Sequence, residues 1–380
     1  MDYLRASLAF KIAKVLRYMR LYGPRRTFAK VAAQRHVRRT YSTLPPTQVA
    51  GPDLKRPVAL IGCGNYAYST IAHFLKRRFG NVIGICMDTD INRAASMSVS
   101  YNIPCFTADA APIFANEAVK LIYIASNHAS HAEYAIRGLQ AGKSVYIEKP
   151  HVISEDQLKR LVQVMNASEG RVFLGFNRPG SRFGGIIQEK LSLEQGSGMY
   201  NWFIAGHELE PGHWYFKPEE GGRVLGNLCH WTDFVFRLVG GNAFPIRIVP
   251  AKSPQSDSDI SVSYVFGEGS IASITFSAKG HTFEGVKERF AGHKGNCLVA
   301  MDDFERLVID VLEKKQVYRN LFRDHGHERN IVAAFDAVRN KVPRSDGRER
   351  AFVANTGWLF LKTKEALDAN TPVTINAYGA

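Results

Sequence analysis

The chain lacks several features that would assign it to common classes of protein. None of its apolar runs reaches the about 18 uninterrupted residues that a membrane-spanning helix requires. Its five cysteines are scattered and include no Cys-x-x-Cys pair. An odd number of cysteines without such a framework predicts free thiols in a reducing compartment and argues against a structural zinc site. Neither a G-x-S-x-G nor a P-loop motif is present, so no serine hydrolase or P-loop nucleotide site is indicated.

Acidic residues are scarce in the first 50 positions, which hold 11 Lys and Arg but one acid, Asp2, for a net charge of +10. The other 330 positions hold 38 basic and 34 acidic residues, a net charge of +4. The basic balance therefore belongs mainly to an N-terminal extension, residues 1–50. The remainder, in a chain that is 45% hydrophobic and 22% charged, predicts a globular protein of two domains.

The extension predicts an amphipathic helix that ends at Gly23-Pro24. Its apolar arc contains Leu4, Leu8, Ile12, Val15, Leu16 and Met19, and the basic residues Lys11, Lys14, Arg17 and Arg20 lie opposite. Three interpretations stay open: docking on the protein itself or on a partner subunit, a peripheral membrane contact through residues 1–22, and a mitochondrial targeting peptide processed near Arg39–Ser42. The predicted location is cytoplasmic, with membrane association or a mitochondrial location as alternatives. Nucleic acid is not an expected partner, because the aromatic residues form no stacking pattern.

A glycine-rich turn follows the apolar run at 57–61 and precedes a helical pattern at 68–78. The turn reads Gly62, Cys63, Gly64, Asn65, Tyr66, Ala67. The first glycine permits a tight turn, the second lets a pyrophosphate approach the backbone, and Ala67 takes the place of a third glycine. This pattern predicts a dinucleotide whose phosphates lie at the N-terminus of the helix.

The next predicted strand, at 82–87, ends on an acid, Asp88. A carboxylate there can accept hydrogen bonds from the ribose 2′-hydroxyl and would repel a 2′-phosphate. Thr89 follows Asp88, and the nearest arginine, Arg93, lies a helical turn further on. NAD is therefore favoured over NADP, and the alternative for Asp88 is a helix N-cap.

Two further strands, at 119–125 and 144–147, end in polar residues. The residues that follow them are Ser126, Asn127, His128, Glu148, Lys149 and Pro150. Alternation of strand and helix predicts a doubly wound parallel sheet, in which ligands bind beyond the carboxyl ends of the strands. We therefore expect these residues at the same edge as the glycine turn.

These motifs together resemble the Gfo/Idh/MocA family of NAD(P)-dependent oxidoreductases, in the branch related to bi-domain oxidoreductases. The stretches that carry the resemblance are VALIGCGNYA, GICMDTD, IASNHASHAEYAIRGLQAGKSVYIEKP, GFNRPGSR, GGRVLGNLCHWTDF, ISVSYVFGEGSIASITFSAKG and VKERF, within roughly residues 55–345. The resemblance implies a Rossmann domain at 51–175 and a second α/β domain at 176–380. It also implies an open, largely antiparallel sheet in the second domain, assembly into a homodimer or homotetramer, and a Lys149–Pro150 bond that is often cis.

The resemblance places Lys149 near the nicotinamide and makes His230 a catalytic acid or base. Oxidation of an alcohol requires a proton acceptor, and burial or a nearby cation can lower the pKa of a lysine enough for that role. Glu148 is predicted to orient Lys149 or to contact ribose. The alternatives are a Lys149 that only hydrogen-bonds its ligands and a His230 that is structural. The family pattern has an aspartate four residues before this histidine, where the chain has Gly226.

Further residues are predicted to bind a carbohydrate-like substrate: Asn177, Arg178, His213, Trp214, Asn227 and His230. An aromatic platform suits the apolar face of a sugar ring, and Arg178 suits a carboxylate or phosphate. Ordinary packing is the alternative for each of them. No metal-ligand constellation is recognised, and His325 and His327 are interpreted as polar groups at a helix N-terminus.

The sequence thus predicts hydride transfer to or from a secondary hydroxyl of a sugar, cyclitol or nucleotide sugar. Two other functions stay open on the same fold. One is a redox-neutral glycosidase that retains NAD, and the other is a non-catalytic NAD-binding sensor or partner protein.

Overall fold

The computed structural model describes residues 7–48, 54–206, 212–253, 256–280, 283, 285–343 and 347–380. Leu4 and Arg5 of the predicted first helix lie outside these residues. The chain forms two compact units. The Rossmann unit comprises Arg25–Gly175 and His327–Gly357, and the sheet unit comprises Met1–Pro24, Phe176–Gly326 and Trp358–Ala380.

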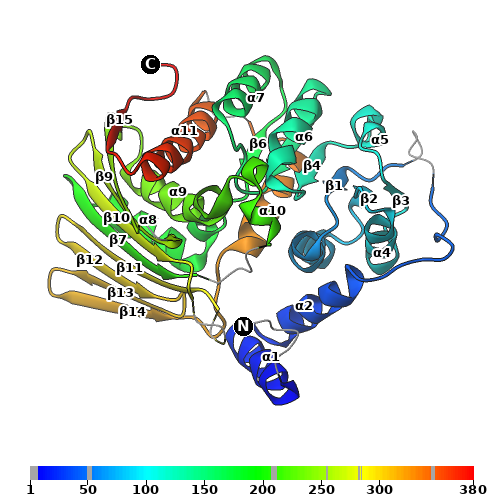
Figure 1. The fold of residues 1–380 in the computed structure, drawn as a ribbon, viewed down its shortest axis with the longest axis horizontal. Helices are drawn as coiled ribbons and strands as arrows, with labels where there is room; N and C mark the ends of the chain where they lie inside the picture. Colours follow the sequence, from blue (N-terminus) through cyan, green and yellow to red (C-terminus); the bar gives the residue numbers. More distant parts are fainter. Residues whose placement is uncertain are drawn as a thin grey trace. The chain divides into compact units, whose positions relative to one another are not determined.

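The Rossmann unit is built on six short, buried strands. They are β1 (Val58–Ile61), β2 (Ile83–Met87), β3 (Cys105–Thr107), β4 (Leu121–Ile124), β5 (Ser144–Ile147) and β6 (Val172–Leu174). All pair in parallel, in the order β3-β2-β1-β4-β5-β6 (Figure 1). The order reverses between β1 and β4, so the carboxyl ends of these strands form the edge at which such sheets bind ligands. The predicted doubly wound sheet is confirmed.

Helices cover this sheet because its strands are apolar on both faces. They are η2 (Ala67–Ala72), α3 (His73–Phe79), α4 (Ile91–Tyr101), α5 (Ala111–Ala115), α6 (His128–Gln140), α7 (Glu155–Ala167) and α10 (His327–Arg339). The last of these comes from late in the chain: Ile331 and Phe335 are buried in the core, and the Tyr123 hydroxyl donates to the Ile331 carbonyl at 2.7 Å. The structure therefore adds a C-terminal segment to the Rossmann unit that the predicted division at 175/176 did not include.

The sheet unit contains nine strands. They are β7 (Gly198–Ala205), β8 (Ile246–Ser253), β9 (Ser256–Phe266), β10 (Ile271–Ser277), β11 (Lys287–Lys294), β12 (Cys297–Asp302), β13 (Arg306–Val311), β14 (Lys314–Arg319) and β15 (Val373–Ile375). Their order is β14-β13-β12-β11-β7-β10-β9-β8-β15, and every pair except β7 with β10 is antiparallel. The largely antiparallel sheet is confirmed.

One face of this sheet is covered and the other is open. Buried and exposed residues alternate along β7, as period-two strands require when one face is packed. The helices of this unit include α8 (Arg182–Ser192), α9 (Cys229–Val239) and the second half of α11 (Arg348–Ala369). Figure 1 shows α8 and α9 on one side of the sheet. On the open face Met199, Phe203 and Leu298 are each more than half exposed, at 55%, 53% and 54%.

The extension forms two helices, α1 (Leu8–Tyr22) and α2 (Pro24–His36), which separate at Gly23 as predicted. Helix α1 docks on the sheet unit, where the Leu21 carbonyl accepts a hydrogen bond of 2.7 Å from the Arg323 N–H. Three residues of its apolar arc, Leu8, Ile12 and Leu16, are exposed, whereas Val15 and Met19 are half-buried. Among the described residues, no helix combines the length and apolarity needed to cross a membrane.

Candidate active site

The glycine turn has the geometry that a dinucleotide requires. Gly62 has φ of 89°, and a Cβ on it would lie 2.5 Å from the Ala125 carbonyl oxygen, so only glycine fits. A Cβ on Gly64 would meet no atom within 4 Å, which leaves room for a pyrophosphate. The Asn65 side-chain oxygen is buried and accepts no hydrogen bond from the described residues. The residues present therefore fit the predicted cofactor.

Asp88 lies beside this turn at the end of β2. Its Oδ2 accepts from the Cys63 N–H at 2.7 Å and its Oδ1 from the Asp90 N–H at 3.0 Å. Each carboxylate oxygen has a second lone pair, so a ribose hydroxyl can still be accommodated. The N-cap of α4 is Asp90, which accepts from the Asn92 N–H at 3.0 Å. The N-cap alternative for Asp88 is therefore wrong.

The end of β4 is tied to the Lys-Pro turn by a histidine that the sequence analysis did not single out. The His131 ring lies 2.8 Å (Nδ1) from the Pro150 carbonyl and 3.1 Å (Nε2) from the Ser126 carbonyl. Burial lowers the pKa of His131 to about 4, so near pH 7 the neutral ring carries one N–H and donates to one of these two carbonyls. Asn127 is the N-cap residue of α6, and His128 begins that helix and is buried.

At the end of β5 the chain delivers Glu148 and Lys149. The Glu148 N–H donates to the Ile124 carbonyl at 2.9 Å, and the Lys149–Pro150 bond is cis, as expected. Glu148 is 6% exposed, whereas Lys149 is half-buried. Burial raises the pKa of Glu148 to about 7, although Lys149 and nearby tyrosine hydroxyls oppose that shift. A carboxyl that titrates near neutrality therefore adjoins the predicted catalytic lysine.

A polar network surrounds the Glu148 carboxyl. The Tyr146 hydroxyl donates to Oε1 at 3.2 Å, and Tyr66 of the glycine turn also hydrogen-bonds this carboxyl. On its other side the Tyr66 hydroxyl lies 3.2 Å from Nδ1 of His327, the first residue of α10. Asn330 of α10 donates to the Tyr146 hydroxyl at 3.1 Å. His327 does begin a helix, but sequence reasoning missed its place and that of Asn330 in this network, because both lie far along the chain.

In the sheet unit, His230 is the second residue of α9 and is half-buried, with the Phe176 ring edge-on at 6.0 Å. It follows a π-helical turn, η6 (Val224–Leu228), which contains Gly226 and Asn227. The Asn227 side-chain oxygen is buried and accepts no hydrogen bond from the described residues. Such irregular turns occur often at functional sites, which fits the predicted substrate contact.

Arg178, predicted to bind substrate, forms a buried ion pair in the sheet unit. Its guanidinium donates two hydrogen bonds, of 2.6 and 2.7 Å, to the Glu288 carboxylate. Glu288 also accepts a hydrogen bond of 2.9 Å from Nε1 of Trp231. Arg178 is 8% and Glu288 0% exposed. The adjoining Asn177 is buried and accepts a hydrogen bond from Arg178. Removing the charge of Arg178 would leave the buried Glu288 carboxylate unbalanced, and the contact of Arg178 with a substrate stays a prediction.

Trp214 begins the short helix η4 (Trp214–Phe216), and His213 is its N-cap, whose Nδ1 accepts from the Tyr215 N–H at 3.2 Å. Trp214 is 37% exposed and contacts Tyr215 edge-on, with ring centroids 4.5 Å apart. Residues 207–211, which precede them, lie outside the described part of the chain. An aromatic surface is thus present, and its contact with a substrate stays a prediction.

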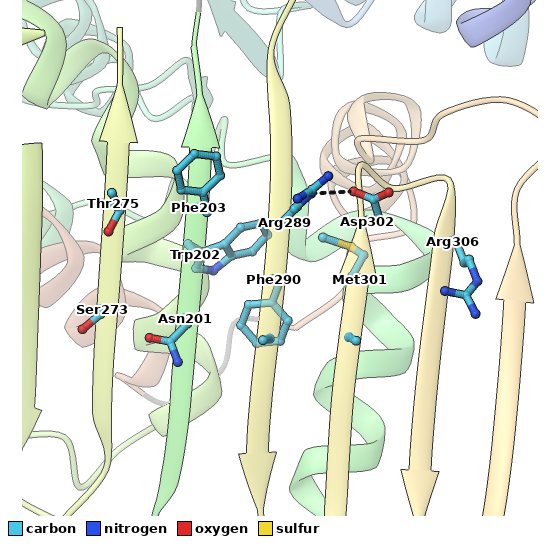
Figure 2. Close-up of a pocket in the computed structure, with 12 residues that line it drawn as sticks. Asn201, Trp202, Phe203, Ser273, Thr275, Arg289, Phe290, Met301, Asp302 and Arg306 are labelled. Carbon is cyan, nitrogen blue, oxygen red and sulfur yellow. Dashed lines mark hydrogen bonds and ion pairs between the residues drawn. The ribbon is translucent and has the colours of Figure 1, made fainter. Parts of the chain in front are cut away.

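The structure brings together the cofactor residues at the ends of β1, β2, β4 and β5, within the Rossmann unit. Asn227 and His230 lie together within the sheet unit, so the shared role of Lys149 and His230 stays a prediction. A hollow of about 470 Å³ lies elsewhere, on the open face of the nine-stranded sheet (Figure 2). It includes Asn201, Thr275 and the ion pair of Arg289 with Asp302, and no predicted site residue lines it. Across the described residues, no group of three or more His, Cys, Asp or Glu suits a metal ion.

The fold and these residues define a class of protein: a dinucleotide-binding Rossmann unit joined to a unit with a large, mostly antiparallel sheet. Residues 56–176 match the oxidoreductase family Gfo/Idh/MocA, with an NAD-binding Rossmann fold. This match lies in the Rossmann part of the chain and agrees with the resemblance that its motifs carry. Levoglucosan dehydrogenase in complex with NADH and L-sorbose has the same fold, with a TM-score of 0.69 at 16% identity, over 85% of this chain and 100% of that one.

Curated relatives share shorter segments. The uncharacterized oxidoreductase YhhX of Escherichia coli is 41% identical over 165 residues, which is 40% of this chain and 46% of YhhX. The oxidoreductase cns1 of Cordyceps militaris is 25% identical over 51% of this chain and 25% of its own length. Inositol 2-dehydrogenase of Pseudomonas savastanoi pv. phaseolicola is 28% identical over 32% of this chain and 37% of its own. The chain thus spans less than half the length of each of these relatives.

Proposed function

We propose that the protein is an NAD-dependent oxidoreductase that moves a hydride to or from a secondary hydroxyl carbon of a sugar, cyclitol or nucleotide sugar. One observation carries the proposal: an open glycine turn, Asp88 and the Glu148–Lys149 pair gather at one edge of the parallel sheet. The names of a relative, inositol 2-dehydrogenase, and of a structural neighbour, levoglucosan dehydrogenase, support a polyhydroxylated substrate.

We assign cofactor binding and proton transfer to residues of the Rossmann unit. Bound NAD supplies the acceptor or donor of the hydride. The N–H groups of the glycine turn bind the pyrophosphate, and Asp88 binds the ribose. Lys149 takes the hydroxyl proton at Nζ during oxidation and returns it during reduction. Glu148, with its pKa raised to about 7, holds or releases a proton at Oε1 near neutral pH.

On the sheet unit we assign the substrate contacts to α9 and the turn before it. His230 is the second acid or base, since imidazole changes its charge close to neutral pH. The buried Asn227 oxygen accepts a hydrogen bond from a substrate hydroxyl. The exposed side of Trp214 offers an aromatic face to a sugar ring.

The test is hydride transfer with a panel of sugars, cyclitols and nucleotide sugars, followed by NADH absorbance. Lys149→Ala should lower turnover at least ~100-fold, the usual share of one acid–base group. Lys159→Ala, which removes an exposed lysine of α7, should change nothing. Wild-type turnover in Lys149→Ala would contradict the role of this lysine. Release of an aglycone without net NADH would indicate the glycosidase, and NAD binding without any hydride exchange would indicate the sensor.

The NAD preference is tested at Asp88. Asp88→Ala removes the charge that repels a 2′-phosphate, so the ratio of NAD to NADP affinities should fall. An unchanged ratio would contradict the ribose assignment.

We also propose that α1 contacts an anionic membrane surface. Its exposed stripe, Leu8, Ile12 and Leu16, is 73%, 52% and 59% exposed, on an extension with a net charge of +10. Apolar side chains flanked by basic ones suit a lipid–water interface. Binding to vesicles that contain phosphatidylserine should be lost when all three are changed to Ser, and kept in Leu193→Ser, which alters an exposed leucine on another helix end. Binding by both variants would contradict the proposal.

The open sheet face is proposed as the surface of a homodimer or homotetramer, because exposed apolar side chains pair across neighbouring strands there: Val265 of β9, Ile271 of β10 and Met199 of β7. Phe203 lies further along β7 on the same face. Changing Phe203 to Glu should yield a monomer in analytical ultracentrifugation. A wild-type monomer would contradict this assembly.

A further inference from the structure

Helix α2 of the extension packs against the elements that follow the glycine turn. Thr27, Ala29, Ala33 and His36 of this helix are buried. Near its start, the Arg26 guanidinium donates to the Ser69 carbonyl and to Thr70 Oγ1, and stacks over the Phe74 ring at 4.7 Å. Ser69 and Thr70 lie in the π-helical turn η2, where the normal i to i−4 hydrogen bonds are interrupted. Arg26 therefore satisfies a carbonyl in the irregular part of this helix.

At the other end of α2, His36 reaches the glycine turn itself. The imidazole is 3% exposed, with Nε2 2.7 Å from the Cys63 carbonyl and Nδ1 2.9 Å from Ser96 Oγ. It stacks on Tyr68, with ring centroids 4.4 Å apart. A carbonyl can only accept, so Nε2 carries the hydrogen, and the neutral ring accepts the Ser96 hydroxyl at Nδ1. Both ring nitrogens and one ring face are thus used to fix the side chain.

The contact acts on the peptide that joins Cys63 to Gly64 in the turn. Cys63 and Gly64 are joined by a trans peptide, whose C=O and N–H point in opposite directions. Because His36 holds the Cys63 carbonyl, the Gly64 N–H points away from His36. The Cys63 N–H is also fixed, since it donates to Asp88 at 2.7 Å. One histidine therefore restrains the residue that links the pyrophosphate turn to the ribose acid.

We infer that His36 is a positioning residue of the dinucleotide site, and that α2 is an integral part of that site. The inference rests on the NAD binding of the proposed function and is independent of the substrate. Its consequence for the extension is direct: processing at Arg39–Ser42 would separate α2 from the unit whose cofactor turn it supports. The segment that follows is also fixed, because the Tyr41 N–H donates to Asn92 Oδ1 at 2.9 Å.

The test uses the full chain, without sugar, and three variants. His36→Phe keeps a ring of similar size against Tyr68 but removes both hydrogen bonds. His36→Gln restores a neutral N–H donor and an acceptor. Phe28→Ala alters the exposed face of α2, where this side chain is 68% exposed, and serves as the control. Dissociation constants for NAD and for ADP-ribose are measured by titration calorimetry, at a temperature where circular dichroism shows each variant fully folded.

His36→Phe should weaken NAD and ADP-ribose alike by about tenfold, the share of one well-placed hydrogen bond. His36→Gln and Phe28→Ala should bind as the wild type does. Wild-type affinity in His36→Phe, or equal weakening in Phe and Gln variants, would overturn the inference. Should His36→Phe fail to fold, Ser96→Ala is used instead, because it removes the hydrogen bond to Nδ1 of His36. Unchanged NAD affinity in Ser96→Ala would also overturn the inference. Failure of the wild type to bind NAD would instead reject the proposed function.

Discussion

Glu148 and Glu288 are both buried, at 6% and 0% exposed, yet the pKa values of their carboxyl groups shift in opposite directions. Burial raises the pKa of Glu148 to about 7, against the smaller opposing effects of Lys149 and two tyrosine hydroxyls. Burial also favours the neutral form of Glu288, but Arg178 overcomes it and holds the pKa of that carboxyl below its usual value. His325 and the Trp231 N–H assist Arg178.

The difference shows how partners decide what a buried acid can do. A carboxylate gripped by an arginine fork stays charged and serves the fold. A carboxyl that accepts hydrogen bonds from tyrosine hydroxyls and a backbone N–H, beside a lysine, gains or loses its proton near neutral pH and is suited to acid–base work. The charged carboxylate, Glu288, lies on β11 beside Trp231 of α9. The titrating carboxyl, Glu148, follows the carboxyl end of β5 in the parallel sheet. Variants at the two carboxyls and their partners can break or sharpen this comparison.

The largest expected effect comes from Arg178→Ala. It leaves the Glu288 carboxyl buried without its cation, which should lower the free energy of unfolding by about 3–5 kcal/mol. Urea denaturation measures the loss. The control is Arg289→Ala, next to Glu288 on β11, which breaks an exposed ion pair of 3.2 Å with Asp302. It should lower the free energy of unfolding by at most about 1 kcal/mol. Equal losses in the two variants would contradict a special role for the buried pair.

Glu148→Gln should change the pH dependence of stability. Between pH 4.5, the ordinary pKa, and about 7, the folded state binds more protons at this carboxyl than the unfolded state does. The contribution of Glu148 to the free energy of unfolding therefore falls by about 3 kcal/mol as pH rises through this window, and levels off above it. Denaturation of the cofactor-free protein at pH 5 and pH 8 should show that the variant lacks this fall.

At Glu288 the pH dependence of stability should have the opposite sign to that at Glu148. Because its pKa is lowered, its contribution is present above pH 4.5 and is lost only as pH falls through the lower, folded-state pKa. The difference between wild type and Glu288→Gln should therefore change on the acid side alone. A Glu148→Gln curve parallel to the wild type would mean that Glu148 has an ordinary pKa.

Trp231→Phe tests the second partner of Glu288. It keeps an aromatic ring below the Arg178 guanidinium, which lies 4.7 Å from the indole, and removes only the N–H donor to Glu288. Loss of one hydrogen bond to a charged group should cost about 1.5–3 kcal/mol. Trp358→Phe, which removes a bond of 3.2 Å to the Asn376 carbonyl at the surface, is the control and should cost less. The reverse order would argue that Arg178 alone sustains the Glu288 charge.

The same contrast explains which parts of the molecule could be predicted from sequence. The cofactor edge depends on backbone: Gly62 must have positive φ, Gly64 must leave space, and the parallel strands must end together. Such constraints act on neighbouring residues, so a short motif reports them. Alternation of strand and helix likewise predicted the parallel sheet, whereas the largely antiparallel sheet was implied by the family resemblance.

The partners of side chains could not be predicted, because they come from distant positions. Arg178 meets Glu288, which is 110 residues away, and the Tyr66 hydroxyl meets His327, which is 261 residues away. An arginine after a strand end reads equally well as a ligand contact or as half of an ion pair. The contact of His36 could not be predicted for a second reason: its partner is the Cys63 backbone carbonyl, and no residue type indicates such a partner.

Tyr66→Phe should have the smallest effect and addresses the Glu148 carboxyl directly. The Tyr66 hydroxyl lowers the pKa of Glu148, so its removal should move the pH-dependent fall in stability upward. The loss at pH 8 should be about 0.5–1.5 kcal/mol, that of one ordinary hydrogen bond. Tyr101→Phe is the matched control, since its hydroxyl donates to the Tyr68 carbonyl at 2.6 Å and no interaction joins it to Glu148 among the described contacts. It should lower stability equally at pH 5 and pH 8. A pH-independent loss in Tyr66→Phe would instead show that this phenol only packs against the carboxyl and does not set its ionisation.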